Sequence, residues 1–234
     1  MKNNALLKLD WDSEFFSKNI ATVVNINLVT AEQLAQYELV CNKVRTDDYS
    51  TIDMFSALNF KIVEGELSFE KHIKADQNQE YSFEQYIARE TDITQLVSLA
   101  KVSYSASRFR LPWFNNTQKE KFYGKWIEKA VLGTFDDICL ILKDGNNIQG
   151  FISLKKDNLN LSIGLIAVSK AYQGKGIAKK LLALAEQYAI QHQCSKMLVA
   201  TQSSNLTAIN LYTRNNYSIS QSSYWLYSSK NTAP

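Results

Sequence analysis

The chain has 234 residues, of which 45% are hydrophobic and 21% are charged, and its formal net charge is +3. This composition is typical of a soluble globular protein, and the length suits one large domain or two small ones. The net charge is too small to indicate nucleic acid as the main partner, and no apolar run approaches the roughly 20 residues that span a bilayer.

The cysteines and the N-terminal stretch exclude further classes of protein. Cys41, Cys139 and Cys194 are few, odd in number and scattered, so we expect buried thiols and neither disulfides nor a metal site. The opening residues, MKNNALLKLDWDSEFF, lack the unbroken apolar core of a secretory signal. We therefore expect a cytoplasmic protein with no metal, no nucleic-acid partner and no membrane partner.

The first third of the chain predicts a small unit of mixed helices and strands. Residues 21–28 favour a strand through their β-branched content. Residues 30–44 predict a helix, with Thr30 as the N-cap of a capping box. Residues 60–72 predict two strands that bend at Gly65.

The most polar stretch near the middle of the chain, HIKADQNQEYS (72–82), indicates a domain boundary. It follows a strand-like run at 66–71 and precedes another at 83–89. We therefore predict a small N-terminal α/β domain over residues 1–76 and a larger domain over residues 80–234.

The larger domain begins with a short strand and two helices. Residues 86–90 suit the strand, and Asp92 is expected to cap the first helix. The apolar residues of that helix recur at helical spacing, and they are Ile93, Leu96, Val97 and Ala100. Residues 115–134 predict the second helix, whose apolar stripe comprises Phe122, Trp126, Ile127 and Ala130.

A hairpin and a crossover follow these helices. The runs ICLILK (138–143) and IQGFISLK (148–155), joined by the turn DGNN, predict the hairpin. Residues 159–168 predict another strand, and residues 196–201 predict one more after a long apolar-periodic helix. This order of elements predicts an α/β fold with a mixed sheet.

Two of the eight glycines, Gly174 and Gly176, lie in the turn between the strand at 159–168 and the long helix. The free amides of a first helical turn and the helix dipole together favour an anion. Glycine lets the backbone approach a phosphate closely, and Lys175 adds positive charge. The turn has neither the third glycine of a dinucleotide fingerprint nor the Gly-Lys-Ser/Thr of a Walker loop. On the turn alone, a plain chain reversal is an equal alternative.

The pattern Gln173-x-x-Gly176-x-Ala178 resembles the pyrophosphate-binding signature of the GNAT superfamily of N-acetyltransferases, whose acyl donor is acetyl-coenzyme A. The resemblance covers about residues 85–227 and implies the GNAT fold, preceded here by the small α/β domain. It departs from the family pattern at Ser169-Lys170, where a Pro-Glu-like pair is usual. The residues that the resemblance assigns to the donor are Ile166, Ala167 and Val168 on the strand and Gln173, Gly174, Lys175, Gly176, Ile177 and Ala178 in the turn.

Two further residues match the family's second cofactor segment. Asn205 is placed to cap a helix, and in the family this residue also contacts the pantetheine arm. Tyr212 lies seven residues further on, near the same helix face. The resemblance implies that Tyr212 protonates the departing thiolate, a role that suits a phenol with an ordinary pKa of about 10. A core aromatic is the alternative for Tyr212 taken alone.

The proton acceptor is not evident in the sequence. The strand at 159–168 contains no Asp or Glu, although the family's general base usually lies there. His72 and His192 are badly placed, because His192 falls at the far end of the long helix. We therefore expect direct attack of a neutral amine on the thioester, helped by positioning and oxyanion stabilisation, with a water chain that carries the amine proton away.

Two stretches, residues 9–21 and 107–137, resemble segments of the bacterial TDP-fucosamine acetyltransferases. This resemblance implies acetylation of the 4-amino group of a TDP-linked 4-amino-4,6-dideoxyhexose for surface-glycan synthesis. The oligomeric state stays open, although members of the GNAT family are often homodimers. Arg108 and Arg110 offer guanidinium groups to a diphosphate, and Trp113 offers a stacking surface to the thymine or the sugar. The alternative is that the arginines are surface residues and the aromatic is core. Other acceptors, such as a different small amine or a protein amino group, and a non-catalytic coenzyme A sensor stay open.

The N-terminal unit repeats a pattern from the end of the chain. Residues 57–71 and residues 214–227 share the order Asn, aromatic, strand, bend and strand. We therefore hypothesise that the first domain is a partial GNAT unit without a glycine loop, which contributes a wall or a strand to the site. A structure without a mixed sheet in residues 1–75 would contradict this hypothesis.

Overall fold

The computed structural model describes residues 4–74, 82–105 and 107–230. The elements of the first range are β1 (Leu6–Lys8), α1 (Asp10–Phe16), β2 (Ile20–Val23), α2 (Ala31–Leu34), β3 (Leu39–Arg45), α3 (Tyr49–Ala57) and β4 (Lys61–His72). The elements of the later ranges are α4 (Ile93–Ser103), α5 (Asn116–Val131), β5 (Ile138–Asp144), β6 (Asn147–Asp157), β7 (Asn160–Val168), α6 (Ile177–Gln191), β8 (Lys196–Gln202), α7 (Leu206–Arg214) and β9 (Ser218–Ser229).

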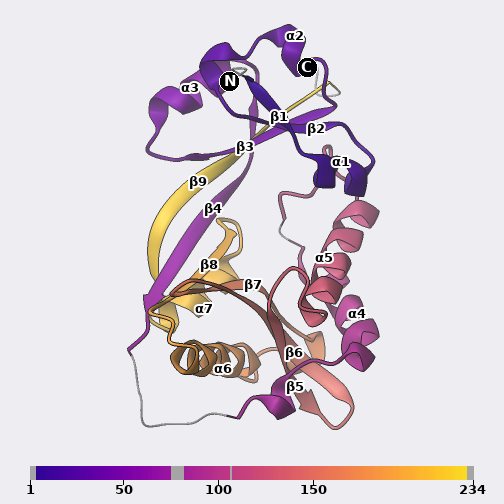
Figure 1. Ribbon diagram of the computed structural model, residues 1–234, viewed down its shortest axis with the longest axis vertical. Helices are drawn as coiled ribbons and strands as arrows, with labels where there is room; N and C mark the ends of the chain where they lie inside the picture. The colour runs from indigo at the N-terminus through magenta and orange to yellow at the C-terminus, as the bar shows by residue number, and fades with distance from the viewer. Residues whose placement is uncertain (1–3, 75–81, 106, 231–234) are drawn as a thin grey trace.

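A single sheet of nine strands, in the order β1-β2-β3-β9-β4-β8-β7-β6-β5, runs through the described part of the chain. Figure 1 shows how the long strands β4 and β9 connect an upper part, built from the N-terminal elements, to a lower part that holds α4 to α7. The predicted α/β fold with a mixed sheet is confirmed, because β2–β3 and β7–β8 are parallel whereas the other neighbours are antiparallel.

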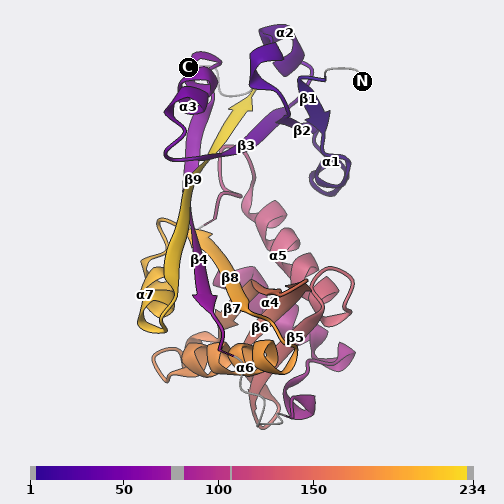
Figure 2. The same ribbon diagram turned by 60° about the vertical axis from the view of Figure 1, so that its left-hand side comes forward.

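Helices cover both faces of this sheet. On one face, α6 and α7 pack through a core that includes Leu181 and Tyr212. On the other face, α4 and α5 pack through a core that includes Leu96 and Ile127, and this core extends to Phe16 of α1. Figure 2 shows α7 and the α4–α5 pair on opposite sides of the sheet. Within the described ranges, no helix is both long enough and apolar enough to cross a membrane.

Most of the elements predicted for the larger domain are confirmed. The two helices are α4 and α5, and the hairpin is β5–β6. The strand β7, the long helix α6 and the parallel strand β8 form the predicted crossover. These elements were predictable because their contacts are local or their apolar periodicity is strong.

The helix predicted over residues 30–44 is wrong in its second half. The capping box at Thr30 is confirmed, but α2 ends at Leu34. The rest of the segment becomes β3, which pairs along its full length with β9. Here a pairing with a strand almost at the other end of the chain overrides the local helical pattern.

Three strand predictions also need correction. Within residues 60–72 there is one strand, Lys61–His72, and its pairing with β9 shifts register between Ile62 and Glu64 and again between Ser68 and Phe69. Gly65 makes no corner, but a Cβ there would come within 2.3 Å of the Ser203 hydroxyl oxygen. Residues 83–90 contain a 3-10 turn and a single bridge at Ile87 in place of a strand. The strand predicted over 21–28 ends at Val23 as β2.

The N-terminal and C-terminal elements interleave in the sheet. The strand β4 lies between β9 and β8, and β9 lies between β3 and β4. The predicted boundary between residues 76 and 80 lies outside the described residues. The sheet itself nevertheless continues without interruption from the elements before that boundary to those after it.

The sheet has an internal two-fold correspondence. Lys61 pairs with Tyr227 and Glu70 pairs with Ser218, so a shift of 157 residues (61 to 218, 70 to 227) exchanges the two strands. The same shift carries β3 (39 to 45) onto β8 (196 to 202). The order antiparallel then parallel recurs in β1–β2–β3 and in β6–β7–β8.

The helix-to-strand junctions correspond as well. Asn59 and Asn216 both have a positive φ, 60° and 63°, and each precedes an aromatic residue. The amide of Phe60 donates to the carbonyl of Phe55 at 3.0 Å, and that of Tyr217 donates to Tyr212 at 3.1 Å. A partial second copy of the GNAT unit predicts this pattern, and we retain that hypothesis as a proposal.

Candidate active site

A wedge opens between the parallel strands β7 and β8. Among the described residues, the two strands pair only from Asn160 to Ile163 of β7, although β7 runs on to Val168 and β8 to Gln202. Ile166, Ala167 and Val168 remain paired to β6 on their other side. Their backbone groups on the wedge side are therefore available to an extended ligand that lies between the strands.

A buried carboxylate supports the bend that opens this wedge. The pairing of β7 with β6 shifts opposite Ser153, which lies between the paired residues Ile152 and Leu154. The Ser153 hydroxyl donates to Asp136 Oδ2 at 2.5 Å and accepts from the amide of Leu165 at 2.9 Å. A Cβ on Gly164 would lie 2.3 Å from the same carboxylate oxygen. A glycine is therefore required at this point of β7.

The glycine turn lies at the end of this wedge. Gly174 and Gly176 have φ values of 75° and 77°, and no atom lies within 4 Å of a Cβ built on either. Gly176 occupies the N-cap position of α6, and no described side chain caps that helix. Its first-turn amides thus face an open surface, which is the arrangement that binds an anion.

The other predicted residues of the turn lie in the same place. Gln173 donates from its side chain to the carbonyl of Val168 at 3.4 Å, which ties the turn to β7. The Lys175 ammonium is exposed and lies 5.2 Å from the centre of the Tyr172 ring. Ile177 is buried against the core and Ala178 is half-buried, so they anchor the first turn of α6.

Asn205, as the N-cap, and Tyr212 belong to α7, the helix that follows β8. The predicted cap is confirmed, since Asn205 Oδ1 accepts from the amide of Ala208 at 3.2 Å. Its side-chain amide also donates to Thr201 Oγ1 at 3.2 Å, which fixes the side chain at the end of β8. Tyr212 is only 2% exposed and packs against Phe69, and this burial raises the pKa of its phenol.

Tyr104 is a residue that the sequence did not single out. Its hydroxyl donates to the carbonyl of Ile166 at 3.2 Å, at the free end of β7. Burial raises the pKa of Tyr104, and the nearby Tyr123 and Tyr212 raise it further. Two protonated phenols therefore lie close to the open part of the wedge.

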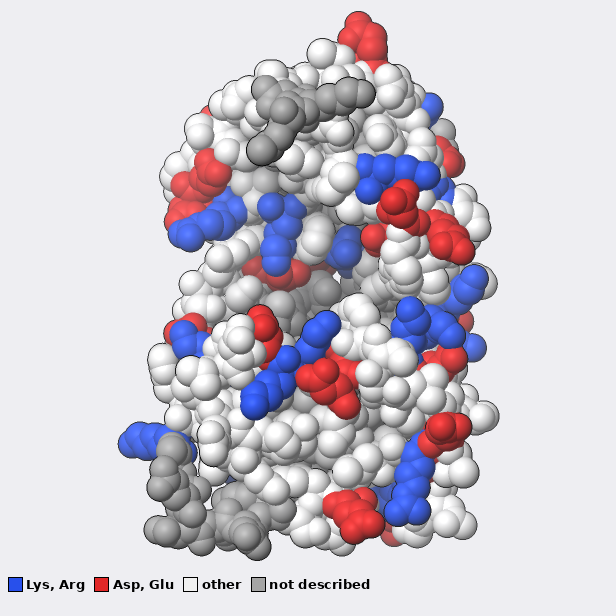
Figure 3. Space-filling model, viewed as in Figure 1, with Lys and Arg blue, Asp and Glu red and all other residues white. Residues whose placement is uncertain are grey.

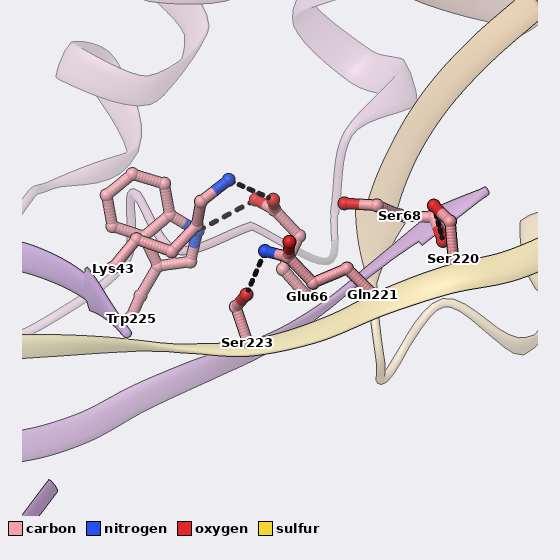
Figure 4. Close-up of polar contacts among 7 residues, drawn as sticks. All are labelled: Lys43, Glu66, Ser68, Ser220, Gln221, Ser223 and Trp225. Atoms are coloured by element: carbon pink, nitrogen blue, oxygen red, sulfur yellow. Dashed lines mark hydrogen bonds and ion pairs between the residues drawn. The ribbon is translucent and has the colours of Figure 1, made fainter. Parts of the chain in front are cut away.

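The middle of the sheet presents a polar surface to a hollow that is visible in Figure 3. Figure 4 shows three strands meeting there, with Lys43 from β3, Glu66 from β4 and Trp225 from β9. Glu66 accepts from the Lys43 ammonium and from the Trp225 indole N–H, both at 2.8 Å. Gln221 and Ser223, hydrogen-bonded to each other at 2.9 Å, extend this group. We call these five residues the Glu66 cluster.

The Glu66 cluster adjoins the wedge. Glu66 pairs across the sheet with Gln202, and Ser68 pairs with Ala200. Gln202 and Ala200 belong to the part of β8 that has parted from β7. Sequence reasoning missed the cluster, because Lys43 and Glu66 lie on strands that carry other charged residues and so give no distinguishing signal. Their convergence depends on β9 lying between β3 and β4.

The three residues predicted for the acceptor lie in the segment before α5. The Arg108 guanidinium carbon lies 3.8 Å from the centre of the Trp225 ring, and Nη1 donates to the Tyr227 hydroxyl. Arg108 thus adjoins the Glu66 cluster. Trp113 is buried against Tyr227, and its Nε1 has no hydrogen-bond partner among the described residues. Arg110 donates to the backbone carbonyls of Val63 and Leu111, so part of its hydrogen-bonding capacity is already used within the protein.

The wedge, the glycine turn and the capped helix have the arrangement expected of an acetyltransferase. The sequence model of the acetyltransferase (GNAT) family matches residues 99–217. A curated relative, the dTDP-fucosamine acetyltransferase of Escherichia coli O6:H1 (strain CFT073), is 34% identical over 225 residues, which cover 94% of this chain and 96% of the relative. The chain belongs to the GNAT family and is an N-acetyltransferase.

Solved structures support the fold. A GNAT-family protein from Novosphingobium aromaticivorans DSM 12444 aligns over 99% of this chain and 91% of its own, with a TM-score of 0.57 and 13% identity. A tandem GNAT protein of the clavulanic acid biosynthesis pathway aligns over 92% of this chain and 76% of its own, with a TM-score of 0.58 and 10% identity. These likenesses extend over the N-terminal elements as well as the larger part.

Proposed function

We propose that the protein transfers an acetyl group from acetyl-coenzyme A to the 4-amino group of a TDP-linked 4-amino-4,6-dideoxyhexose in surface-glycan synthesis. The observation that carries this proposal is the similarity to a dTDP-fucosamine acetyltransferase over nearly the full length of both chains. That similarity includes the N-terminal elements, which lie outside the segment matched by the family model.

The donor binds, in this proposal, along the wedge and the glycine turn. The amides of residues 173–178 hold the pyrophosphate, because the open space at Gly174 and Gly176 admits a phosphate close to the backbone. The free side of Ile166, Ala167 and Val168 pairs with the pantetheine arm, and Asn205 contacts the arm from β8.

The acceptor amine attacks the thioester as a neutral nucleophile, and the main contribution of the protein is to position both substrates. Tyr212 supplies the proton to the departing thiolate, and its burial keeps that proton in place until it is needed. The predicted water chain that removes the amine proton ends, in this proposal, at the Glu66 carboxylate beside the unpaired end of β8.

An acetylation assay tests the proposed acceptor. The TDP-linked 4-amino-4,6-dideoxyhexose is compared with a free polyamine and a peptide N-terminus, and release of coenzyme A is followed with a thiol reagent. We expect turnover with the nucleotide sugar far above that with the other amines, after subtraction of thioester hydrolysis without acceptor. Efficient turnover of a free amine and none of the nucleotide sugar would overturn the proposed substrate.

A cytoplasmic location and a homodimeric assembly also belong to this proposal. The location follows from the scattered cysteines and from opening residues without a secretory core, and the assembly follows from the resemblance to the GNAT family. Light scattering on the purified full chain tests the assembly. A mass of one chain at working concentrations would contradict the homodimer.

A further inference from the structure

A pocket of ≈ 280 Å³ lies between α1 and α5, beside the Glu66 cluster. It is built from both parts of the chain, because α1 contributes Trp11 and Asp12 and α5 contributes four of the lining residues. The full lining comprises Trp11, Asp12, Arg108, Phe122, Lys125, Trp126, Lys129 and Phe135. We call it the α1–α5 pocket.

Aromatic rings form the walls of this pocket, and they are held in place without a ligand. The Trp126 indole N–H donates to the buried Asp136 at 2.9 Å, and its ring meets Phe122 and Phe135 edge to face at 5.6 Å and 5.3 Å. Trp11 meets Phe122 in the same way at 6.3 Å. Trp11 and Phe135 are nonetheless 46% exposed each. A preformed aromatic box with open walls suits a flat ring that stacks in it.

Cations outnumber acids at the same pocket. Arg108, Lys125 and Lys129 line it, against the single carboxylate of Asp12. The Lys129 ammonium lies 5.6 Å from the centre of the Trp11 ring, so positive charge and aromatic surface are adjacent. Lys125 is tied to Glu128 at 2.8 Å at the surface. A flat ring next to an anionic group is the chemistry of a nucleotide.

We propose that the α1–α5 pocket binds the nucleoside diphosphate end of the acceptor, with the base in the aromatic box and the diphosphate against Lys125, Lys129 and Arg108. This inference rests on the proposed function, which supplies a nucleotide-linked sugar. At ≈ 280 Å³ the pocket lies just below the roughly 300–1,000 Å³ range of ligand sites. It therefore takes one end of the substrate and leaves the sugar outside.

Arg108 connects the pocket to the place where the sugar must lie. Its guanidinium lines the pocket and stacks on Trp225 at 3.8 Å. The Trp225 indole in turn donates to Glu66, next to the unpaired end of β8. A substrate whose base lies in the pocket would run past Arg108 with its diphosphate and reach the Glu66 cluster with its amino sugar.

Coenzyme A is the other nucleotide in the reaction, but its site lies elsewhere. The glycine turn opens α6, which packs on the sheet face of Tyr212. The α1–α5 pocket lies on the opposite face, where α5 and α1 share a core. One face thus serves the donor nucleotide and the other serves the acceptor nucleotide. The N-terminal elements then have a function, because α1 provides one wall of the acceptor site.

Isothermal titration calorimetry of the full-length protein with dTDP tests the proposal. Trp11→Ala removes one open wall and Lys129→Ala removes one cation, and each should weaken dTDP binding by about tenfold or more, the size of a lost base-stacking or phosphate contact. Coenzyme A binding should stay within about twofold in both. The matched controls are Tyr49→Ala, an aromatic side chain that is 73% exposed on α3, and Lys101→Ala, an exposed lysine on α4.

The controls should leave dTDP binding unchanged, and the pocket variants should raise KM for the nucleotide sugar with little change in kcat. Wild-type dTDP affinity in both Trp11→Ala and Lys129→Ala, in an enzyme that still acetylates the nucleotide sugar, would overturn the pocket assignment and leave the proposed function intact. An enzyme that binds no dTDP and acetylates only free amines would overturn the proposed acceptor and this inference together.

Discussion

Tyr212, the general acid of the proposed reaction, is a buried side chain. The residue is 2% exposed on α7 and lies near Tyr104, whose hydroxyl marks the open end of β7. Because burial raises the pKa of Tyr212 above its ordinary value, the phenol stays protonated across the whole neutral range. The Tyr212 phenol therefore keeps its proton at neutral pH, beside the proposed position of the thioester.

Replacing Tyr212 with phenylalanine should lower kcat by about 10²–10⁴-fold, because a general acid contributes on that scale. KM for acetyl-coenzyme A should change little, since the ring is kept. In the wild type, kcat should show no decline from ionisation of Tyr212 below pH 10, because the folded-state pKa lies above that value. Steady-state kinetics across pH check both expectations.

Tyr188→Phe is the matched control, since that ring stacks on His192 at 3.8 Å near the C-terminal end of α6, at the opposite end of the helix from the glycine turn. An unchanged kcat in Tyr212→Phe would remove Tyr212 as the acid.

The glycine turn permits a second prediction, which separates backbone strain from ligand binding. Gly176→Ala places a Cβ at φ 77°, so we expect a loss of about 1–2 kcal/mol in the free energy of unfolding. The new methyl group also stands where the phosphate should approach, so KM for acetyl-coenzyme A should rise severalfold. Denaturant unfolding and steady-state kinetics measure the two effects.

Gly133→Ala is the control: Gly133 has a φ of 65° beyond α5, so the substitution carries the same backbone penalty at a position away from the proposed donor site. Equal effects of the two variants on KM would mean that the turn does not bind the donor.

At the scale of elements, the N-terminal strands reproduce the wedge and then close it. Strands β2 and β3 pair in parallel only at Ile20 with Leu39 and Ala21 with Val40. Beyond this point the Asn42 side chain crosses the gap. Its Oδ1 accepts from the amide of Val23 at 2.6 Å, and its Nδ2 donates to the carbonyl of the same residue at 3.3 Å.

The positions related by the shift of 157 residues show why this second wedge is not a second active site. Phe55 corresponds to Tyr212, so the phenol is absent, and Asn42 corresponds to Val199. No glycine turn follows β2, where the chain enters a 3-10 turn at Ile26–Leu28. We propose that the N-terminal unit is a partial copy of the GNAT unit. The Asn42 side chain closes its wedge, and its strands and helix α1 form part of the acceptor site.

Asn42→Ala should therefore cost about 1–3 kcal/mol of the free energy of unfolding, because it leaves the amide and carbonyl of Val23 without their partner. The kcat of the folded variant should match that of the wild type, since Asn42 takes no part in the reaction. Chemical denaturation and a standard activity assay measure this. Asn210→Ala, exposed on α7, is the control and should shift stability by no more than about 0.5 kcal/mol. Stability equal to that of the control would show that the Asn42 bridge does not hold the strands.

At the scale of the whole molecule, the central strands make the two parts of the chain interdependent. The strand β4 from the N-terminal part lies between β9 and β8. Removal of β4 would leave backbone groups of β9 and β8 without hydrogen-bond partners in the middle of the sheet. A nine-stranded sheet built in this way is expected to unfold as a unit.

We therefore predict one cooperative transition in urea, with coincident curves from far-UV circular dichroism and tryptophan fluorescence. Trp11 and Trp225 report on the N-terminal and central parts, and Trp126 reports on α5. A chain that begins at residue 82 should fail to give this transition, because it lacks β4. Two separate transitions, or cooperative folding of the shortened chain, would show instead that the predicted division into 1–76 and 80–234 describes independent domains.

The extent to which the sequence predicted the fold follows the range of the contacts involved. The hairpin β5–β6 and the crossover β7–α6–β8 were predicted because each is made by neighbours in the chain. Residues 39–44 were included in the predicted helix 30–44, although in the structure they pair with β9, about 180 or more positions further along the chain. No local pattern carries that information.

The same distinction between local and long-range contacts applies to the residues of the candidate site. The glycine turn, the Asn205 cap and the spacing between Asn205 and Tyr212 were predictable from the sequence alone, because turn chemistry, capping and helical spacing are properties of a few consecutive residues. The contacts of Glu66 with Lys43 and Trp225, and the pocket that Trp11 and Trp126 both line, depend on the folded chain. These groups come from strands and helices far apart in the chain, and the order of strands in the sheet brings them together.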